Sequence, residues 1–278
     1  MFKNVPQVLA YKSALNTGSF VTPNYILSKN GDEINALSRM CPHRYYPIGE
    51  EGETLTEITC KFHGFTFDSS GKPLNNNLRL ACTETNIGRS GLVFKNFVEP
   101  EHKWVDDLAN EKNLVYSHSW SGTSKGSWLW IMEAEADMLH IRKGGIHPWL
   151  SENYKPEEVI LEQGDGWICQ SPPHGWWLYI YPYTFVEWDV GRVAVNYTIP
   201  HDKNSEYGFD WISQFYYDPN ISSEQRKTFE MFEDVFKEDV EAIEKQMRPY
   251  TPLAKTFNAF EDHTYHFGDW VTKYKNKL

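Results

Sequence analysis

The sequence is poor in positive charge and has no long hydrophobic run. Lys and Arg number 27 against 38 Asp and Glu, and the net charge of −11 at pH 7 argues against nonspecific binding to nucleic acid or to an anionic membrane. No apolar run reaches the length of about 18 residues that marks a transmembrane helix, and residues 1–8 lack the apolar core of a signal peptide. We therefore expect a cytoplasmic protein with no membrane partner.

Nucleotide-binding glycines and cysteine are also scarce. No Gly-x-Gly-x-x-Gly fingerprint is present, so the chain is not expected to bind a flavin or a nicotinamide nucleotide itself. Of only four Cys, Cys82 and Cys169 lie outside any motif and are expected to be reduced and buried. The length of 278 residues allows one large or two ordinary domains. Aromatic residues make up 15%, which is typical of a rich core and also suits an apolar pocket.

Four metal-binding residues occur in two short segments. Cys41-Pro-His43 is followed, after the sixteen residues 44–59, by Cys60-Lys-Phe-His63. Two Cys and two His form the ligand set of a [2Fe–2S] cluster in which the Cys bind one iron and the His bind the other. The same donors could form a tetrahedral zinc site, but zinc motifs usually pair Cys with Cys and His with His. The spacing therefore favours the cluster.

This pattern resembles the Rieske motif, Cys-x-His followed by Cys-x-x-His, with Gly64 supplying a tight turn after the last ligand. It is similar to the oxygenase branch of the family, because Tyr46 and Phe62 stand where respiratory Rieske proteins carry an additional, bridged pair of Cys. Phe65 replaces a Ser that donates to the cluster, which implies a potential of about −150 mV, at the low end of the Rieske range. Tyr45 departs from the usual Gly of the first loop.

The chain is expected to have two domains. The first, residues 1–98, resembles the small all-β Rieske fold, and its short apolar runs predict strands at 25–28, 34–38, 65–68 and 91–95. Residues 99–125 are polar and mark the crossing into the second domain, residues 99–278. The resemblance implies that this catalytic domain is an antiparallel sheet with flanking helices, of the helix-grip type. The expected fold class is α+β.

A helix is predicted from residue 127 until Gly144 ends it. Glu133, Asp137 and His140 are spaced by four and three, so they are predicted to share one face. The segment resembles the family's Trp-x₄-Glu-x₃-Asp-x₂-His stretch, which implies that His140 and the later His147 bind a mononuclear iron together with one carboxylate. The alternative is two unrelated His on a solvated helix and its loop.

Strands are predicted in the second domain at 167–169, 176–188 and 192–199. Every second residue from 177 to 185 is aromatic, which predicts a sheet face packed under a helix, or else a wall of the substrate pocket. Near the C-terminus, residues 261–270 resemble the family's closing strand and final helix. His263 and His266 would point to opposite faces of such a strand, so they are not predicted as ligands.

A long helix is predicted from about Ser222 to Gln246, with apolar residues repeating at three and four. Asp239 falls in the middle of its apolar stripe, whereas Glu238 points elsewhere and is expected to be solvated. A buried carboxylate requires a cation or a network of donors. A salt bridge to an Arg is one possibility. The resemblance implies the other, that Asp239 is the third iron ligand.

Taken together, the resemblance implies a short member of the Rieske non-haem iron oxygenases, acting as the terminal component. It would use O₂ to hydroxylate or oxidatively demethylate a small organic substrate, with electrons from NAD(P)H through a separate reductase and possibly a ferredoxin. Asp137 would accept from His140 and link it to a cluster-binding His of the next subunit, His63 or His43, in a homotrimer or a multiple of it. The alternatives are a Rieske electron-transfer protein with a non-catalytic second domain and a zinc-bearing structural module.

Overall fold

The computed structural model describes residues 5–137, 140–141, 145–150, 154–155, 158–202, 205–246, 249–252 and 262–274. The chain forms two compact units. Pro6–Ser119 and Gln214–Tyr217 form the N-terminal unit, and Met1–Val5, Trp120–Ser213 and Asp218–Leu278 form the C-terminal unit. The N-terminal unit continues through the polar crossing segment to Ser119. The domain boundary expected after residue 98 stays a prediction.

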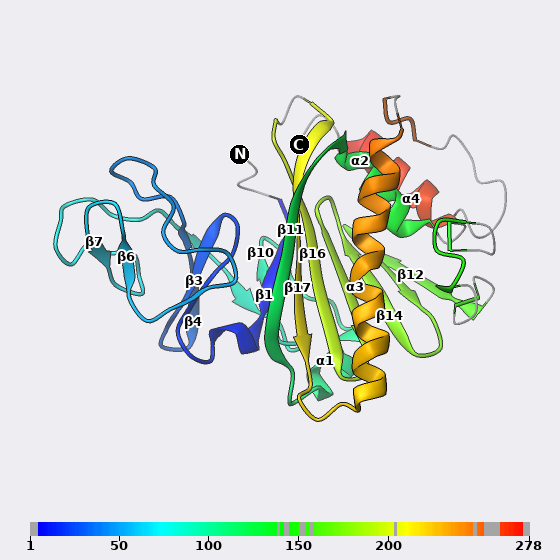
Figure 1. The fold of residues 1–278 in the computed structure, drawn as a ribbon, viewed down its shortest axis with the longest axis horizontal. Helices are drawn as coiled ribbons and strands as arrows, with labels where there is room; N and C mark the ends of the chain where they lie inside the picture. Colours follow the sequence, from blue (N-terminus) through cyan, green and yellow to red (C-terminus); the bar gives the residue numbers. More distant parts are fainter. Residues whose placement is uncertain are drawn as a thin grey trace. The chain divides into compact units, whose positions relative to one another are not determined.

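Short strands make up most of the N-terminal unit (Figure 1). They form a five-stranded sheet in the order β5-β2-β3-β4-β8, a β6-β7 hairpin and a three-stranded sheet in the order β1-β10-β9. One turn of 3₁₀ helix, Lys12–Leu15, and helix α1, Lys103–Asn110, also belong to it. The strands are β1 Gln7–Tyr11, β2 Ser19–Val21, β3 Tyr25–Asn30, β4 Glu33–Ser38, β5 Thr54–Leu55, β6 Ile58–Cys60, β7 Phe65–Phe67, β8 Cys82–Glu84, β9 Asn86–Ile87 and β10 Leu92–Lys95.

The strands predicted at 25–28, 34–38, 65–68 and 91–95 are confirmed as β3, β4, β7 and β10. Strands β3 and β4 alternate between buried and exposed residues only in part. Gly31, with φ of +65°, supplies the left-handed residue that the turn between them requires. Cys82 lies on the short strand β8 and is exposed, so the prediction that it is buried is wrong, whereas Cys169 is buried as predicted.

A seven-stranded sheet, ordered β11-β17-β16-β15-β14-β13-β12, is the largest sheet among the described residues. Successive strands from β12 to β16 pair antiparallel, which confirms the predicted α+β class with an antiparallel sheet. Strands β11 and β17 contribute residues to both units. The strands are β11 Val115–Ser127, β12 Ile160–Gly164, β13 Trp167–Ser171, β14 Gly175–Ile180, β15 Thr184–Asp189, β16 Arg192–Pro200 and β17 Tyr207–Tyr217.

The run predicted as one strand at 176–188 is a hairpin. Strand β14 ends at Ile180 and β15 begins at Thr184, with Pro182 in the turn, where a residue without an N–H cannot continue the ladder. The aromatic stripe therefore divides. Tyr181 and Tyr183 pack in the core, while other members line a cavity described below, so each of the two interpretations of the stripe holds for part of it.

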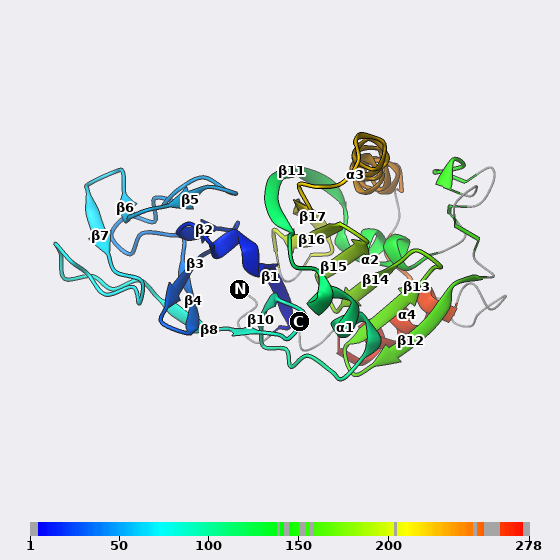
Figure 2. The ribbon, with the colours of Figure 1, turned by 90° about the horizontal axis from the view of Figure 1, so that it is seen from below.

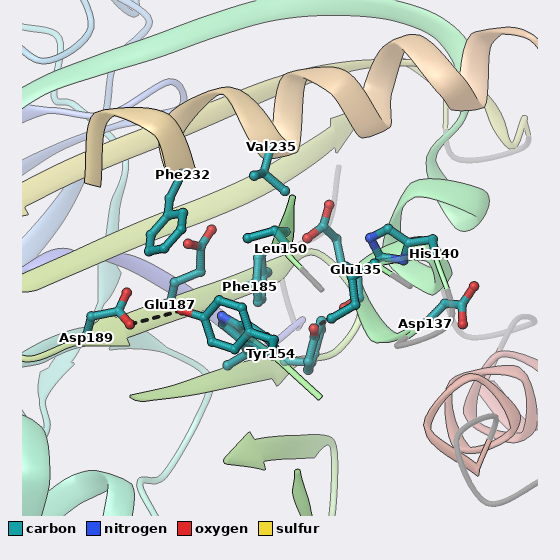
Figure 3. A pocket seen from close by; sticks show the side chains of 13 residues that line it. Glu135, Asp137, His140, Leu150, Tyr154, Phe185, Glu187, Asp189, Phe232 and Val235 are labelled. Atoms are coloured by element: carbon teal, nitrogen blue, oxygen red, sulfur yellow. Dashed lines mark hydrogen bonds between the residues drawn. The ribbon is translucent and has the colours of Figure 1, made fainter. Parts of the chain in front are cut away.

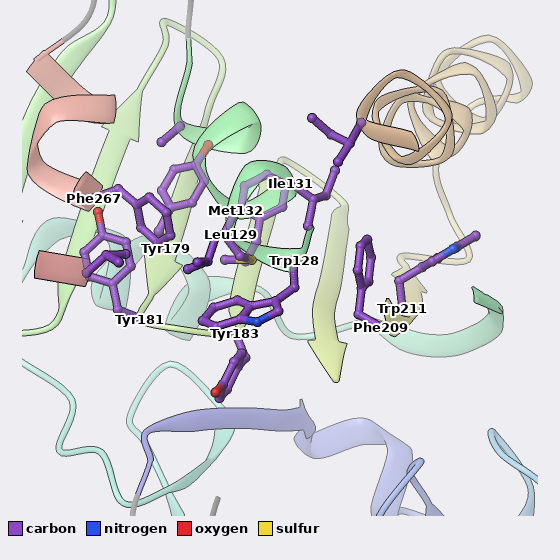
Figure 4. Close-up of a cluster of buried hydrophobic side chains, with 14 of the residues drawn as sticks. Trp128, Leu129, Ile131, Met132, Tyr179, Tyr181, Tyr183, Phe209, Trp211 and Phe267 are labelled. Carbon is purple, nitrogen blue, oxygen red and sulfur yellow. The ribbon is translucent and has the colours of Figure 1, made fainter. Parts of the chain in front are cut away.

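Three helices accompany this sheet: α2 Trp128–Ala136, α3 Ser223–Glu244 and α4 Asp262–Tyr274. Helix α2 contacts α3, α4 and β16 (Figure 2). Its apolar side chains, among them Trp128 and Ile131, join the main core cluster with the aromatic residues of the β14-β15 hairpin and with Phe267 of α4 (Figure 4). Among the described residues, no helix is long and apolar enough to span a membrane.

The predicted helix 222–246 is confirmed as α3. Ser222 and Gln225 form a capping box at its start, in which each side chain satisfies a backbone N–H of the other residue. Residues 261–270 were expected to form a closing strand and the final helix. The helix is confirmed as α4, and the strand is wrong because α4 already begins at Asp262. Thr264, Phe267 and Val271 are all buried there, at the spacing of three and four that one helix face requires.

Helix α2 is shorter than predicted, because it ends at Ala136. Asp137 leaves the helical conformation, with φ of −82° and ψ of 105°, so Glu133, Asp137 and His140 do not share a helix face. Beyond the helix, the backbone N–H of Ile146 donates to the carbonyl of His140 at 2.9 Å. His140 and His147 both lie beside Asp239 of α3.

Candidate metal centres

The first site lies at the two ligand loops of the N-terminal unit. Cys41 and Cys60 are buried, whereas His43 and His63 are exposed. The Nδ1 atoms of the two His lie 3.2 Å apart. Two nitrogens bound to one ion at about 2.1 Å, with a tetrahedral angle between them, would be about 3.4 Å apart. The imidazole pair thus has the spacing of two ligands of one iron.

The two thiols suit the other half of a cluster. Burial raises the pKa of the Cys41 thiol, while the backbone N–H groups of His43 and Arg44 lower it by favouring the thiolate. Cys60 adjoins Cys41 and also raises its pKa, as expected of two thiols that lie close together. The donor set and its arrangement fit a [2Fe–2S] cluster with Cys on one iron and His on the other.

Tyr45 adopts the left-handed conformation that the usual Gly would favour. Its φ is 55°, its N–H donates to the carbonyl of Cys41 at 2.9 Å, and its side chain is 78% exposed. In the second loop, Gly64 has φ of 71° and its N–H donates to the carbonyl of Cys60 at 2.8 Å. The two loops therefore turn in the same way, and the departure at Tyr45 leaves the first loop's backbone intact.

Aromatic rings connect the two loops at the positions where a disulfide is absent. The rings of Tyr46 and Phe62 stack at 5.3 Å with an angle of 19° between their planes. Phe65 stacks on His43 at 5.1 Å, so it covers a predicted ligand instead of donating to the cluster. The loops were expected to be unbridged, and a noncovalent stack joins them.

The second site brings together His140, His147 and Asp239 from three parts of the chain. One potential ligand atom from each lies within 4.8 Å of the others. Nε2 of His147 is 2.9 Å from Oδ1 of Asp239, and Nε2 of His140 is 3.8 Å from the same oxygen. Asp239 is only 1% exposed and points from the buried face of α3, as predicted.

A cation fits this site. The second oxygen of Asp239, Oδ2, is buried without a hydrogen-bond partner. Among the described residues, the salt bridges of Asp239 are to the two His and none is to an Arg. Although burial lowers the pKa of His147, Asp239 and Glu238 raise it overall, so the site favours positive charge. Two His and one carboxylate form the facial triad typical of non-haem Fe(II); that these residues bind iron stays a prediction.

Glu238 is closer to this site than the sequence suggested. It was expected to be merely solvated, but its Oε2 accepts from Nδ1 of His147 at 2.8 Å. A carboxylate on the far nitrogen fixes the orientation of a ligating His. The contact expected from Asp137 to His140 is not formed, because Nδ1 of His140 is buried without a hydrogen-bond partner. Asp137 lines the adjacent cavity instead, and its role as an electron bridge stays a prediction.

A cavity opens beside the triad and encloses about 530 Å³ of empty space, part of it open to solvent. Figure 3 shows Glu187, Asp189 and Phe232 at one end and Glu135, Asp137 and His140 at the other. Trp177, Tyr179 and Phe185, from the alternating aromatic stripe, also line it. Apolar walls with a few carboxylates next to a metal triad are the features of a small-molecule site.

Glu135, Glu187 and Asp189 were not predicted as site residues. The alternation of β15 places Glu187 and Asp189 on the same side as the pocket-lining Phe185, a signal that the sequence does contain. Glu135 offers a weaker signal, as one of only two acids in the otherwise apolar α2. Helical spacing placed Asp137 and His140 on one face with Glu133, but the helix ends at Ala136, before either of them.

The comparisons with known proteins agree with this geometry. Residues 6–83 match the model of the Rieske [2Fe-2S] domain. The solved structure of the quaternary ammonium Rieske monooxygenase CntA in complex with an inhibitor is similar over 99% of this chain and 90% of its own, with 17% identity and a TM-score of 0.77. The complex of CntA with gamma-butyrobetaine has the same coverage and identity and a TM-score of 0.73.

A second similar structure is NdmA from Pseudomonas putida CBB5. It matches over 99% of this chain and 91% of its own, with 16% identity and a TM-score of 0.58. A search of the curated proteins gives no match. The chain therefore has a Rieske [2Fe–2S] domain at residues 6–83 and, over 99% of its length, a fold similar to those of the Rieske monooxygenase CntA and of NdmA.

Proposed function

We propose that this protein is the terminal oxygenase of a Rieske system, which hydroxylates a small organic substrate or removes a methyl group from it by oxidation. One observation carries the proposal: His140, His147 and Asp239 converge, and His140 lines a cavity, in the same chain that holds a Rieske domain. A one-electron carrier joined to an open iron site is the combination that reductive O₂ chemistry requires.

His140, His147 and Asp239 would hold one Fe(II), and this iron, when bound, supplies the O₂ chemistry. Three protein ligands leave about three positions of an octahedral ion open for O₂ and for substrate. Glu238 would keep His147 in the tautomer that presents Nε2 to the iron. The apolar wall, including Phe185 and Leu150, would exclude water from the reacting centre.

Electrons would arrive from NAD(P)H through a separate reductase, possibly with a ferredoxin, and would enter at the exposed His43 and His63. We further propose that the protein works in the cytoplasm as a homotrimer, in which Asp137 of one subunit faces the cluster of the next. Asp137 lines the cavity together with His140, and this position supports the proposed role.

Metal analysis and O₂ uptake would test this function. Protein reconstituted anaerobically should hold about three irons and two acid-labile sulfides per chain. Two of the irons and both sulfides belong to the cluster, and one iron belongs to the mononuclear site. His140→Ala and Asp239→Asn should each lose one iron and all substrate-coupled O₂ uptake while keeping the Rieske spectrum. Two irons and no further Fe(II) uptake by the unmodified protein would instead favour an electron-transfer protein, and a colourless zinc protein would exclude both.

A further inference from the structure

We propose that the cavity selects a small cationic substrate and that Glu135 recognises its positive charge. The inference deepens the oxygenase function proposed above and rests on it. Glu135 is 9% exposed, its Oε1 has no hydrogen-bond partner, and it lines the cavity. A buried carboxylate oxygen without a partner is costly. Because Glu135 lines the cavity, a ligand bound there could satisfy it.

The charge of the cavity wall is unbalanced. Four lining residues carry carboxylates, and none of the described lining residues is Lys or Arg: the acids are Glu135, Asp137, Glu187 and Asp189. Behind the wall, the fully buried Arg192 donates to Glu187 at 2.8 Å and to Asp189 at 3.2 Å. One guanidinium thus serves two carboxylates, and no described lining residue supplies a second cation.

Glu135 feels the electrostatic field of two other carboxylates, Asp239 and Glu187. Burial raises its pKa well above the ordinary value, and the negative charges of Asp239 and Glu187 raise it further. Iron at the triad would neutralise Asp239 but would leave Glu187 and Asp189 with a single Arg between them. A cation beside Glu135 would offset the remaining charge, while a second anion would be repelled.

The remaining walls suit a methylated ammonium group. Tyr154 and Trp177 line the cavity with ring centroids 4.9 Å apart, and Tyr154 lies 6.1 Å from the ring of Phe232. Aromatic faces attract a cation that carries methyl groups instead of hydrogen-bond donors. Asn196 and Arg192 hold the two oxygens of Glu187, so its carboxylate cannot swing out to meet the ligand. Of the carboxylates on the wall, Glu135 is the one with a buried oxygen that has no hydrogen-bond partner.

The test compares two probes of equal shape that differ in charge. Choline and its neutral carbon isostere, 3,3-dimethyl-1-butanol, are titrated by calorimetry into the anaerobic protein that carries cluster and Fe(II). Choline should bind at least about tenfold more tightly than the isostere, a difference of about 1.4 kcal/mol. Equal affinities, or tighter binding of the neutral probe, would overturn the inference without any variant.

Glu135→Gln assigns the effect to one residue. It should weaken choline binding about tenfold or more and leave the isostere within about twofold, because only the charge is lost. Glu84→Gln, an exposed acid on β8, removes the same charge and should change neither affinity. Equal iron content and melting temperature establish that the variants are folded. Unchanged choline affinity in folded Glu135→Gln contradicts the assignment.

The outcomes also separate this inference from the oxygenase function. Substrate-coupled O₂ uptake with a neutral compound, together with no preference for choline over its isostere, would retain the oxygenase and reject the cation site. Charge-selective binding that depends on Glu135, in a protein that consumes no O₂ with any bound cation, would retain the site and reject the oxygenase.

Discussion

Tyr45 holds a conformation that a side chain makes costly. An L-residue in the left-handed region loses about 1–2 kcal/mol, and φ of Tyr45 is 55°. We expect Tyr45→Gly to raise the free energy of unfolding of the N-terminal unit by about 0.5–1 kcal/mol, after the greater entropy of Gly in the unfolded chain is subtracted. Chemical denaturation followed by the cluster's visible absorption measures this. Arg44→Gly, next to it at negative φ, should be destabilising, and equal losses for both variants would contradict the account.

Glu238 is the second residue with a testable role. Its bond to His147 should tune the ligand without contributing a ligand itself. We expect Glu238→Gln to weaken Fe(II) binding about 10–100-fold, as is usual when the partner of a ligating His is lost. Glu241→Gln, exposed on the same helix, is the matched control. Competition with a coloured chelator under anaerobic conditions gives both affinities, and equal affinities would mean that Glu238 is only a surface acid.

Glu133 should make stability depend on pH. Burial raises its pKa from 4.5 to about 7, despite the bond donated by the Tyr250 hydroxyl at 2.5 Å. Because the folded protein holds this proton more tightly than the unfolded chain does, the stabilisation is complete below pH 4.5 and is lost as the pH rises toward 7. A shift of this size corresponds to about 3 kcal/mol.

Glu133→Gln removes the titrating group and keeps an acceptor for Tyr250. The melting temperature of the variant should therefore fall less than that of the unmodified protein between pH 5 and pH 7.5 (roughly the window of the shift). Glu224→Gln, an exposed acid at the start of α3, should retain the full pH dependence. Parallel curves for Glu133→Gln and the unmodified protein would show that Glu133 does not titrate in this range.

The site residues that could be predicted from the sequence are those marked by a short motif or by their spacing within one helix. The cluster loops and Asp239 follow from short motifs and from one polar residue in an apolar stripe. Glu135 and Arg192 could not be found in this way, because their significance depends on which strands and helices come together around the cavity. The same holds for Glu238, whose partner His147 lies 91 residues away.

At the scale of elements, α3 was predictable and the end of α2 was not. Ser222, the three-four apolar repeat and Pro249 delimit α3 in the sequence. Helix α2 is almost entirely buried, so its polar and apolar residues do not define two faces, and no Gly or Pro marks its end at Ala136. The hairpin at 175–189 was missed although Pro182 lies in its turn, because apolar and aromatic residues continue on both sides of that Pro.

The two ligand loops act as a pair that the Tyr46–Phe62 stack holds together. Such an aromatic pair contributes about 0.5–1.5 kcal/mol beyond its burial. We expect Phe62→Ala to release the cluster faster when a chelator is added, measured as bleaching of the visible bands. Leu74→Ala removes a comparably exposed apolar side chain from the same unit and serves as the control. Equal bleaching rates for the two variants would mean that the loops are held by their backbone bonds alone.

At the scale of the whole molecule, the sequence predicts two metal sites in one chain but not how electrons pass between them. In the proposed trimer, an electron leaves the cluster of one subunit and reaches the iron of the next through Asp137. Two inactive variants then become a test. His63→Ala should lose the cluster and keep the mononuclear iron, and His140→Ala should do the reverse.

Co-expression of the two variants with different affinity tags yields mixed oligomers. If electrons cross between subunits, these should recover a substantial part of the O₂ uptake, because an intact cluster can face an intact iron across one interface. The matched comparison combines the His63→Ala chain with a double variant, Asp137→Asn with His140→Ala in one chain. The O₂ uptake of this oligomer identifies which subunit must supply Asp137. Asp137 belongs to the iron-bearing subunit in this scheme, so that comparison should retain activity, whereas Asp137→Asn in the His63→Ala chain should abolish it. No recovery in any mixed oligomer would mean that each chain transfers electrons only within itself.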